Sequence, residues 1–133
     1  MMRVLVCGGR KYRDRGAIYR FLDDLHRRHP DLVIIHGKAP GADELADAWA
    51  RSRKVPVLPF AADWDDLNAR PLALRRRKNG GYYNAAAGSI RNAKMLREGK
   101  PHLVAAFPGG KGTKNMMELA KSADVPIVQP AGP

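Results

Sequence analysis

The chain has 133 residues, and 44% of them are hydrophobic, which is enough for one globular domain and too many for a disordered tail. No apolar run reaches the ~18 residues of a membrane span, and a single cysteine excludes an internal disulfide. The 24 Lys and Arg residues against 13 Asp and Glu residues give a net charge of +11, which favours a partner that carries phosphate or another polyanion.

Strands and helices are expected to alternate along the first half of the chain. The first residues predict a buried strand at 3–7 rather than a signal peptide, so we expect a cytoplasmic protein with no membrane partner. Asp14 is predicted to cap a helix that Pro30 ends, and strands at 32–35 and 55–60 flank a helix at 43–53. Pro56 and Pro59 place the 55–60 strand at a sheet edge.

The second half begins with an irregular stretch at 61–88. Ser89 is predicted to cap a helix that runs to Glu98, followed by a strand at 103–107, a helix from about 114 to 122 and a strand at 125–128. Strands that are apolar on both faces and alternate with helices predict an α/β fold, in which a parallel sheet is covered on both sides. We expect one domain over residues 1–133, with a basic loop insertion at about 66–87.

The positive charge is concentrated in one part of the sequence. Residues 69–100 contain nine basic residues and one acid, Glu98, so this segment carries +8. Its centre joins a basic run, two glycines and two aromatic residues: Arg75, Arg76, Arg77, Lys78, Gly80, Gly81, Tyr82 and Tyr83. Such a loop could follow the phosphates of single-stranded nucleic acid and stack on its bases, or it could simply be a solvated basic loop.

Three glycine-containing turns each follow a predicted strand and precede a helix. They comprise Gly8 to Arg10, His36 to Asp43 and Pro108 to Thr113. In a parallel sheet these turns share the edge where ligands bind, and their N–H groups and helix N-termini favour anions. The known nucleotide loops G-x-x-x-x-G-K-[ST] and G-x-G-x-x-G are absent, which disfavours a P-loop ATPase or an ordinary dehydrogenase. We therefore expect a ligand that contains phosphate.

Several side chains near these turns are candidates for contact with that ligand. Arg10 can bind phosphate bidentately, and Asp43 can either satisfy the start of its helix or contact the ligand. Trp64 could stack on a base, as could Tyr82 and Tyr83. His36 could donate a proton or be a packed residue bonded to backbone. Asp63 is a further candidate carboxylate, Cys7 is expected to be a buried hydrophobe, and no metal site is expected.

The same turns carry a resemblance to a known family. The segments GGR at 8–10, HGKAPGAD at 36–43, ADW at 62–64, AGSIRNAKM at 87–95 and FPGGKGT at 107–113 are similar to the YspA-type, cpYpsA-related branch of the SLOG superfamily. The resemblance implies a Rossmann-like three-layer sandwich with a mostly parallel sheet of about five strands. It also implies binding of nucleotides or related ligands and assembly into homodimers or higher homo-oligomers, with no required cofactor.

Two related groups in this superfamily sharpen the expectation. Lonely Guy phosphoribohydrolases cleave the N-glycosidic bond of nucleoside 5′-monophosphates and carry PGGxGTxxE and RKxxM motifs. The sequence RNAKM at 91–95 resembles the second motif, so Arg91 inherits a substrate-contacting role, with Asn92 in place of the lysine. The glutamate of the first motif corresponds to Met116, and Glu118 lies about 200° further around the helix. The second related group is the DNA-processing protein A family, to which the nucleic-acid binding alternative given below corresponds.

The leading hypothesis is therefore a domain that senses or processes a nucleotide-derived ligand such as ADP-ribose, NAD or a nucleoside monophosphate. If the domain catalyses a reaction, N-glycosidic hydrolysis is the one that the resemblance implies, with Asp43 as acid and Arg91 positioning the substrate, although the missing glutamate argues against it. The candidate ligand-binding residues are Gly8, Gly9, Arg10, His36, Gly37, Gly41, Trp64, Asn92, Pro108, Gly109, Gly110, Gly112 and Thr113. The alternative is a single-stranded nucleic-acid binding module that uses Arg75 to Lys78, Tyr82 and Tyr83, and a third is a regulatory subunit with a vestigial pocket.

Overall fold

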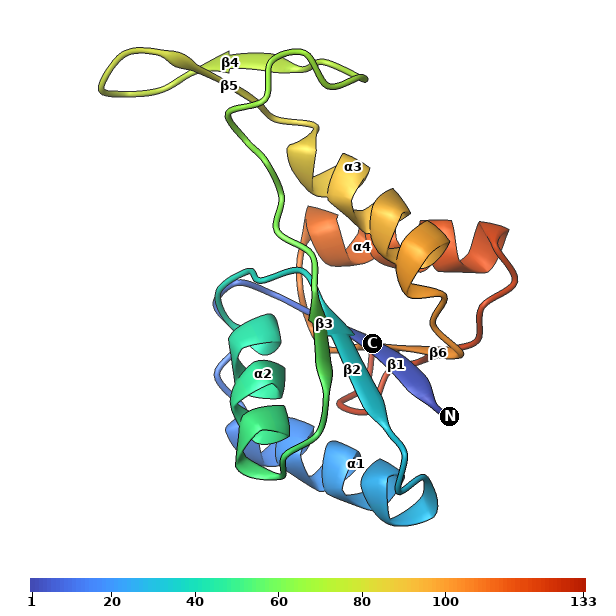
Figure 1. Cartoon of the computed structure of the whole chain (residues 1–133). Coiled ribbons are helices and arrows are strands. Elements are labelled where there is room, and N and C mark those ends of the chain that lie inside the picture. The colour runs from blue at the N-terminus through green and yellow to red at the C-terminus, as the bar shows by residue number, and fades with distance from the viewer.

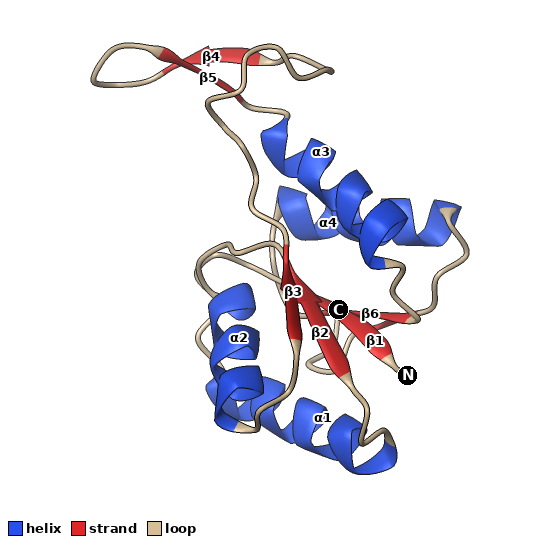
Figure 2. Ribbon diagram, in the orientation of Figure 1, coloured by secondary structure: helices blue, strands red, loops and turns tan.

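A computed structural model describes residues 1–133 and contains a five-stranded parallel sheet in the order β3-β2-β1-β6-β7 (Figure 1). The strands are β1 (Arg3–Cys7), β2 (Val33–His36), β3 (Val57–Pro59), β6 (Leu103–Ala106) and β7 (Ile127–Val128). Helices α1 (Arg15–Arg28) and α2 (Ala42–Ser52) cover one face, and α3 (Ala87–Lys94) and α4 (Lys111–Ser122) cover the other (Figure 2). The predicted Rossmann-like three-layer sandwich is confirmed.

Alternate residues of the central strands face two separate apolar layers. Val4 and Ile34 pack with the buried side chains of α1 and α2, where Trp49 has no exposed surface. Leu5 and Val104 instead pack with Met116 of α4 and its neighbours. The strands are therefore apolar on both sides, as a parallel sheet between two layers of helices requires.

The strand order places a topological switch point between β1 and β6. The chain proceeds from β1 through β2 to β3 in one direction, and β6 then pairs with the opposite side of β1. The turns that follow β1 and β6 leave in opposite directions, so a crevice opens at the carboxyl ends of these two strands.

The stretch at 61–88 contains more regular structure than its sequence predicts. Strands β4 (Leu74–Arg76) and β5 (Tyr82–Asn84) form an antiparallel hairpin that projects from the rest of the fold (Figure 1). The fully buried Asn84 fixes its base, because its side-chain oxygen accepts the N–H groups of Ala73 and Ala86 at 2.9 and 3.0 Å. Two polar donors of the loop are thereby satisfied by one side chain, which hydropathy patterns do not reveal.

Two helices begin earlier than predicted. The capping role of Ser89 is wrong, because α3 begins at Ala87 after Ala86, whose side chain makes no capping bond. Ser89 lies instead in the first turn of α3, with its hydroxyl unused by the helix. Helix α4 begins at Lys111 rather than near 114, and it includes Gly112 despite the low helix propensity of glycine. Helix α3 continues into a π-helical turn, η1 (Met95–Gly99).

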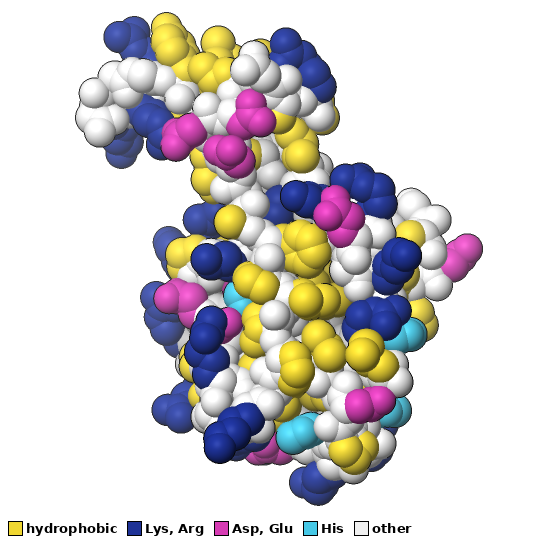
Figure 3. Space-filling view, in the orientation of Figure 1, with side chains coloured by type: hydrophobic (Ala, Val, Ile, Leu, Met, Phe, Trp, Pro, Cys, Tyr) yellow, Lys and Arg dark blue, Asp and Glu magenta, His cyan; other side chains and the backbone are white.

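The basic hairpin is accompanied by acidic side chains (Figure 3). Arg77 forms an ion pair with Asp65 and lies over the ring of Tyr83, with 5.2 Å between the guanidinium carbon and the ring centroid. The sequence count of +8 therefore overstates the local charge, because three aspartates at 63, 65 and 66 precede this segment.

None of the helices combines the length and the hydropathy that crossing a bilayer demands.

Candidate functional site

A cleft of about 840 Å³ lies at the carboxyl ends of β1 and β6. Its walls come from the turn after β1, the turn after β6, and the first residues of α3 and α4. The lining includes Gly8, Gly9, Arg10, Asp43, Trp64, Gly88, Ser89, Arg91, Asn92, Asn115 and all residues from Pro108 to Thr113. Most of the predicted ligand-binding residues are thus brought together in one cavity.

The turns after β1 and β6 are in direct contact, and this contact requires glycine. The N–H group of Gly9 donates to the carbonyl of Pro108 at 2.9 Å. A Cβ atom on Gly9 would lie 2.9 Å from that carbonyl oxygen, and one on Gly109 would lie 2.2 Å from Oγ1 of Thr113. Gly110 and Gly112 differ, since a Cβ there would meet nothing within 4 Å. These two glycines leave the start of α4 open to the cleft.

The turn after β2 contributes in another way. Gly41 has a φ of +84°, and a Cβ there would lie 2.1 Å from the carbonyl oxygen of Gly9. A Cβ on Gly37 would lie 2.4 Å from Nη1 of Arg91. Both glycines are buried and neither lines the cleft. This turn therefore presents Ala39 and Asp43 to the cleft, while its glycines allow close packing behind it.

The start of α4 has the features of an anion site. The backbone N–H groups of Lys111, Gly112 and Thr113 make no hydrogen bond within the protein, and the first turn holds no acidic residue. The first turn of α3 likewise holds no acid and no side-chain cap. Two helix N-termini with partial positive charge thus border one cavity. The start of α2 differs, because Glu44 accepts the N–H of Gly41 at 3.0 Å.

Two arginines line the same cavity. Arg10 is exposed and makes no hydrogen bond or ion pair, so its donors are available to a ligand. Arg91 donates from Nη1 to the carbonyl of Gly37 and from Nε to the side-chain oxygen of Asn92 at 2.9 Å, which leaves Nη2 without a partner. Burial lowers the pKa of Arg91; the charge of Asp43 opposes this lowering and that of Arg10 adds to it. An anion between the two arginines would relieve their repulsion.

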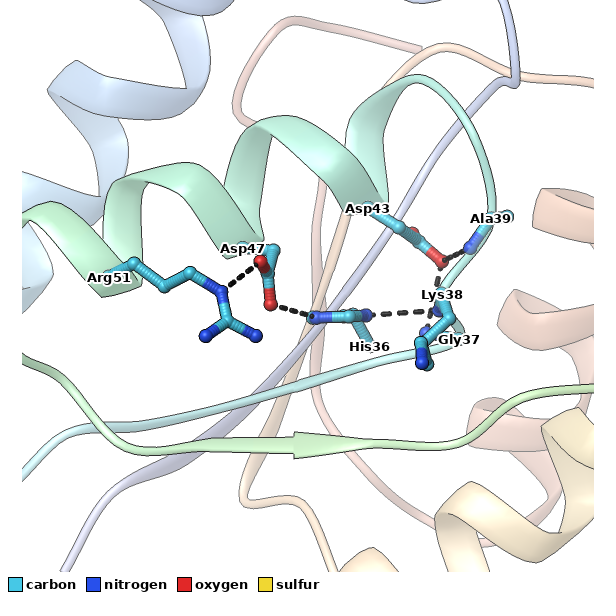
Figure 4. Close-up of polar contacts among 7 residues, drawn as sticks. All are labelled: His36, Gly37, Lys38, Ala39, Asp43, Asp47 and Arg51. Carbon is cyan, nitrogen blue, oxygen red and sulfur yellow. Dashed lines mark hydrogen bonds and ion pairs between the residues drawn. The ribbon is translucent and has the colours of Figure 1, made fainter.

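Asp43 is buried, and one oxygen of its carboxyl group has no hydrogen-bond partner (Figure 4). Its Oδ2 accepts the N–H groups of Gly37 and Ala39 at 3.0 and 3.2 Å, whereas Oδ1 makes no hydrogen bond and is not sealed from the cleft. The residue is only 6% exposed, and burial raises its pKa, although the N–H of Ala39 and the charge of Arg91 act in the opposite direction. Asp43 thus combines a structural role with a carboxyl oxygen that faces the cavity.

His36 lies behind the cleft and does not line it. Its Nδ1 accepts the N–H of Lys38 at 3.0 Å, so the ring proton lies on Nε2 and is donated to Asp47 at 2.8 Å (Figure 4). Lys38 has a φ of +53°, which is uncommon for a residue with a side chain. The histidine therefore holds the turn after β2 in this conformation.

A tryptophan lines the cavity beside the base of the hairpin. Trp64 lines the cleft beside Gly88, and the edge of its ring packs on Tyr83 with 6.5 Å between centroids. The guanidinium carbon of Arg10 lies 5.7 Å from the Trp64 ring centroid. Tyr82 is 51% exposed on the hairpin and does not line the cleft, and neither do the basic residues at 75–78.

Sequence reasoning missed some of the polar lining. Asn115 accepts a hydrogen bond from Nδ2 of Asn92 at 2.9 Å and joins α3 to α4 across the cleft wall. Ser89 and Lys111 also line the cavity. The position of Asn115, two residues after the glycine loop ends at Thr113, could have indicated it, because residues near the start of such a helix lie close to the ligand edge.

The two remaining candidates carry no reactive chemistry in this structure. Burial raises the pKa of Cys7 to about 12, so its thiol is a small apolar group of the core. Asp63 does not line the cleft and accepts the N–H of Asp65 at 3.3 Å within its own loop. No three His, Cys, Asp or Glu side chains converge in a way that could hold a metal ion.

The fold and the cleft define an α/β protein of the Rossmann-like class with its cavity at the switch point of a parallel sheet. Residues 2–66 match the model of the YspA, cpYpsA-related SLOG family. The Gene 61 protein of Mycobacterium phage D29 is 35% identical over 136 residues, which cover 96% of this chain and 95% of that protein. The chain belongs to the YspA, cpYpsA-related SLOG family.

Two solved structures with low sequence identity share the fold, and a third gives a weaker match. The structural-genomics target TM1055 superposes with a TM-score of 0.67 at 16% identity, covering 96% of this chain and 72% of that one. MurG of Acinetobacter baumannii gives 0.59 at 11% identity, covering 96% of this chain and 34% of MurG. DNA processing protein A of Streptococcus pneumoniae gives 0.49 at 18% identity, covering 96% of this chain and 58% of that one.

Proposed function

We propose that the cleft binds a nucleotide or a nucleotide-derived ligand such as ADP-ribose, NAD or a nucleoside monophosphate. The observation that carries the proposal is the convergence of two helix N-termini and two arginines on one cavity. Unbonded N–H groups and positive charge favour an anion, and Arg10 has no acidic partner that would compete with it. Membership of a SLOG family supports the same class of ligand.

We expect the phosphate of this ligand to lie at the start of α4. Gly110 and Gly112 allow an anion to approach the backbone, while Arg10 and Nη2 of Arg91 supply charged donors. The free oxygen of Asp43 lies on the same cavity and can accept a hydroxyl hydrogen bond from a sugar. The ligand therefore has an anionic part and a hydroxyl-bearing part.

A thermal-shift and calorimetry panel tests the proposal. ADP-ribose, NAD, nucleoside 5′-monophosphates and ribose 5-phosphate are added to the protein at low salt. A ligand present at 100 times its Kd stabilises the folded state by about 2.7 kcal/mol. Stabilisation of the wild type by at least one member, lost in Arg10→Ala, supports the proposal. No stabilisation by any member contradicts it.

Asp43 supports N-glycosidic hydrolysis as a second candidate. Its carboxyl can donate a proton to the departing base as the bond from the sugar C1′ to the base nitrogen breaks, and water then supplies hydroxide to C1′ and returns a proton to Asp43. The raised pKa favours the protonated form that such an acid needs. Chromatographic detection of free base from 5′-monophosphates tests it. Asp43→Asn keeps an oxygen for the N–H groups of Gly37 and Ala39, so it should abolish the release of base without unfolding the protein.

The projecting hairpin favours single-stranded nucleic-acid binding as the alternative. Arg75, Arg76 and Lys78 are exposed and form no ion pair, and Tyr82 is exposed beside them. Replacing these three basic residues with Gln should weaken the binding of an oligonucleotide and reduce its salt dependence, while the affinity for mononucleotides is unchanged. Oligonucleotide binding that survives this replacement contradicts the alternative.

A further inference from the structure

The wall of the cleft includes an aromatic side chain as well as an anion-binding turn. Trp64 lies where the cavity meets the base of the hairpin, and its neighbours in the lining include Ala85 and Gly88, which carry no charge. The glycine turn at 108–113 forms the other part of the wall. A ligand with a phosphate at the start of α4 could therefore reach toward this tryptophan within the same cavity.

Trp64 is held in place by contacts on several sides. Its carbonyl accepts the N–H of Asn84 at 2.8 Å, and its ring meets the ring of Tyr83 at an interplanar angle of 67°. A Cβ on Gly88 would lie 3.2 Å from Cη2 of Trp64, so the start of α3 packs closely against the ring. The indole is thus a pre-positioned surface rather than a mobile side chain.

A core role does not account for this tryptophan. Trp49, the other tryptophan of the chain, has no exposed surface and donates its indole N–H to Asp23 at 2.9 Å. Trp64 is half-buried, belongs to neither apolar layer of the core and makes no side-chain hydrogen bond. Trp64 instead lines the cavity.

Arg10 links the two parts of the cleft wall. Its guanidinium lies over the Trp64 ring at 5.7 Å, and no hydrogen bond or ion pair holds it there. An arriving phosphate would attract this guanidinium toward the start of α4 and free the ring face that it overlies. One residue can therefore connect the arrival of the phosphate to the opening of the aromatic surface.

We propose that Trp64 is the platform on which the aromatic base of the ligand stacks, so that the cleft selects nucleotides over sugar phosphates. This inference rests on the proposed function, because it assigns the base of the ligand whose phosphate lies at α4. Stacking tolerates any base, since every base has a π face. The cleft should therefore accept the four common bases with similar affinities.

Titrations with nucleoside 5′-monophosphates and with ribose 5-phosphate test the inference. The nucleotides should bind about 5- to 150-fold more tightly than ribose 5-phosphate, which is the range that alanine substitution of a base-stacking aromatic gives. The nucleotides should also change the tryptophan emission by stacking on the indole. Ribose 5-phosphate has no base and should not produce this change. Trp49 is buried, so the change reports on Trp64.

Variants separate stacking from a packing role. Trp64→Leu keeps a large apolar side chain and should remove the preference for nucleotides, with the affinity for ribose 5-phosphate unchanged. Trp64→Phe should keep part of the preference. Tyr82→Ala is the matched control, because this aromatic residue is exposed outside the cleft and its loss should change neither affinity.

The outcomes distinguish this inference from the proposed function. Equal affinity of the wild type for ribose 5-phosphate and for the nucleotides, with unchanged emission, overturns the stacking platform and leaves the phosphate site standing. A nucleotide preference that persists in Trp64→Leu overturns it as well. Absence of binding by these probes overturns the platform, and absence of binding by ADP-ribose and NAD as well overturns the proposed function.

Discussion

Asp43 and Arg91 form hydrogen bonds with the two backbone groups of the same residue, Gly37. The carboxylate of Asp43 accepts the N–H of Gly37 at 3.0 Å, while the guanidinium of Arg91 donates to the carbonyl of Gly37. The turn after β2 is therefore clamped between α2 and α3. Both side chains also line the cleft. The hydrogen bonds to Gly37 therefore hold the turn after β2 in place and also fix the positions of two charged groups of the cleft.

The raised pKa of Asp43 predicts a pH-dependent stability. A carboxyl whose pKa is higher in the folded protein than its ordinary value of 3.8 binds its proton more tightly when folded. Its contribution to stability is therefore complete below that value and is lost as the pH rises through the folded pKa. Urea denaturation between pH 4 and 8 should show the stability of the wild type falling relative to Asp43→Asn. Parallel curves would contradict the raised pKa, since the other carboxyls are common to both proteins.

Removing Arg10 should weaken ligand binding without destabilising the fold. The side chain makes no hydrogen bond or ion pair, so Arg10→Ala should change the free energy of unfolding by less than about 0.5 kcal/mol. A charge-assisted hydrogen bond contributes about 1.5–3 kcal/mol, so the Kd for ribose 5-phosphate should rise roughly 10- to 150-fold by calorimetry. Arg13→Ala is the control, because Arg13 is exposed and does not line the cleft. Equal effects of both variants would indicate general electrostatics.

Gly41 is expected to be intolerant of a side chain. Its φ of +84° and the 2.1 Å approach of a Cβ to the carbonyl of Gly9 combine backbone strain with overlap. Gly41→Ala should lower the free energy of unfolding by roughly 2–4 kcal/mol in urea denaturation. Gly112→Ala should leave stability unchanged or raise it by up to about 1 kcal/mol, because its Cβ meets nothing within 4 Å and lies in a helix. Similar losses in both would refute the close packing of the turns.

Cys7 should be inert in the folded protein. Burial raises its pKa to about 12, so almost no thiolate exists at pH 8. Ellman's reagent should leave the native protein unlabelled over an hour and label one thiol per chain in guanidinium chloride. Rapid labelling of the native protein would show that the end of β1 opens to solvent.

The sequence was informative wherever local chemistry decided the structure. Periodicity located the strands and helices of the sheet, and Pro56 and Pro59 correctly indicated the edge position of β3. Asn84 shows where this approach fails, because one buried amide bonded to Ala73 and Ala86 organises a hairpin that hydropathy does not reveal. Tertiary contacts likewise start α3 at Ala87, ahead of the polar residue that resembles a cap.

The site was predicted as a set of residues but not as an arrangement. Glycines after strands indicated the edge of the sheet where the cleft lies, yet only distances show that Gly37 and Gly41 pack behind it while Gly110 and Gly112 face the cavity. The proximity of Arg10 to Trp64 joins positions more than fifty residues apart, and nothing in the local sequence connects them.

The edges of the sheet limit how copies of this chain can associate. Strand β3 has three residues with Pro59 at its end, and β7 has only two. Such short, proline-bearing edges offer few backbone groups to a neighbouring strand, which protects a parallel sheet from open-ended strand pairing. If copies of this chain associate, we therefore expect them to do so through helix faces or the hairpin, and to separate without disturbing the sheet.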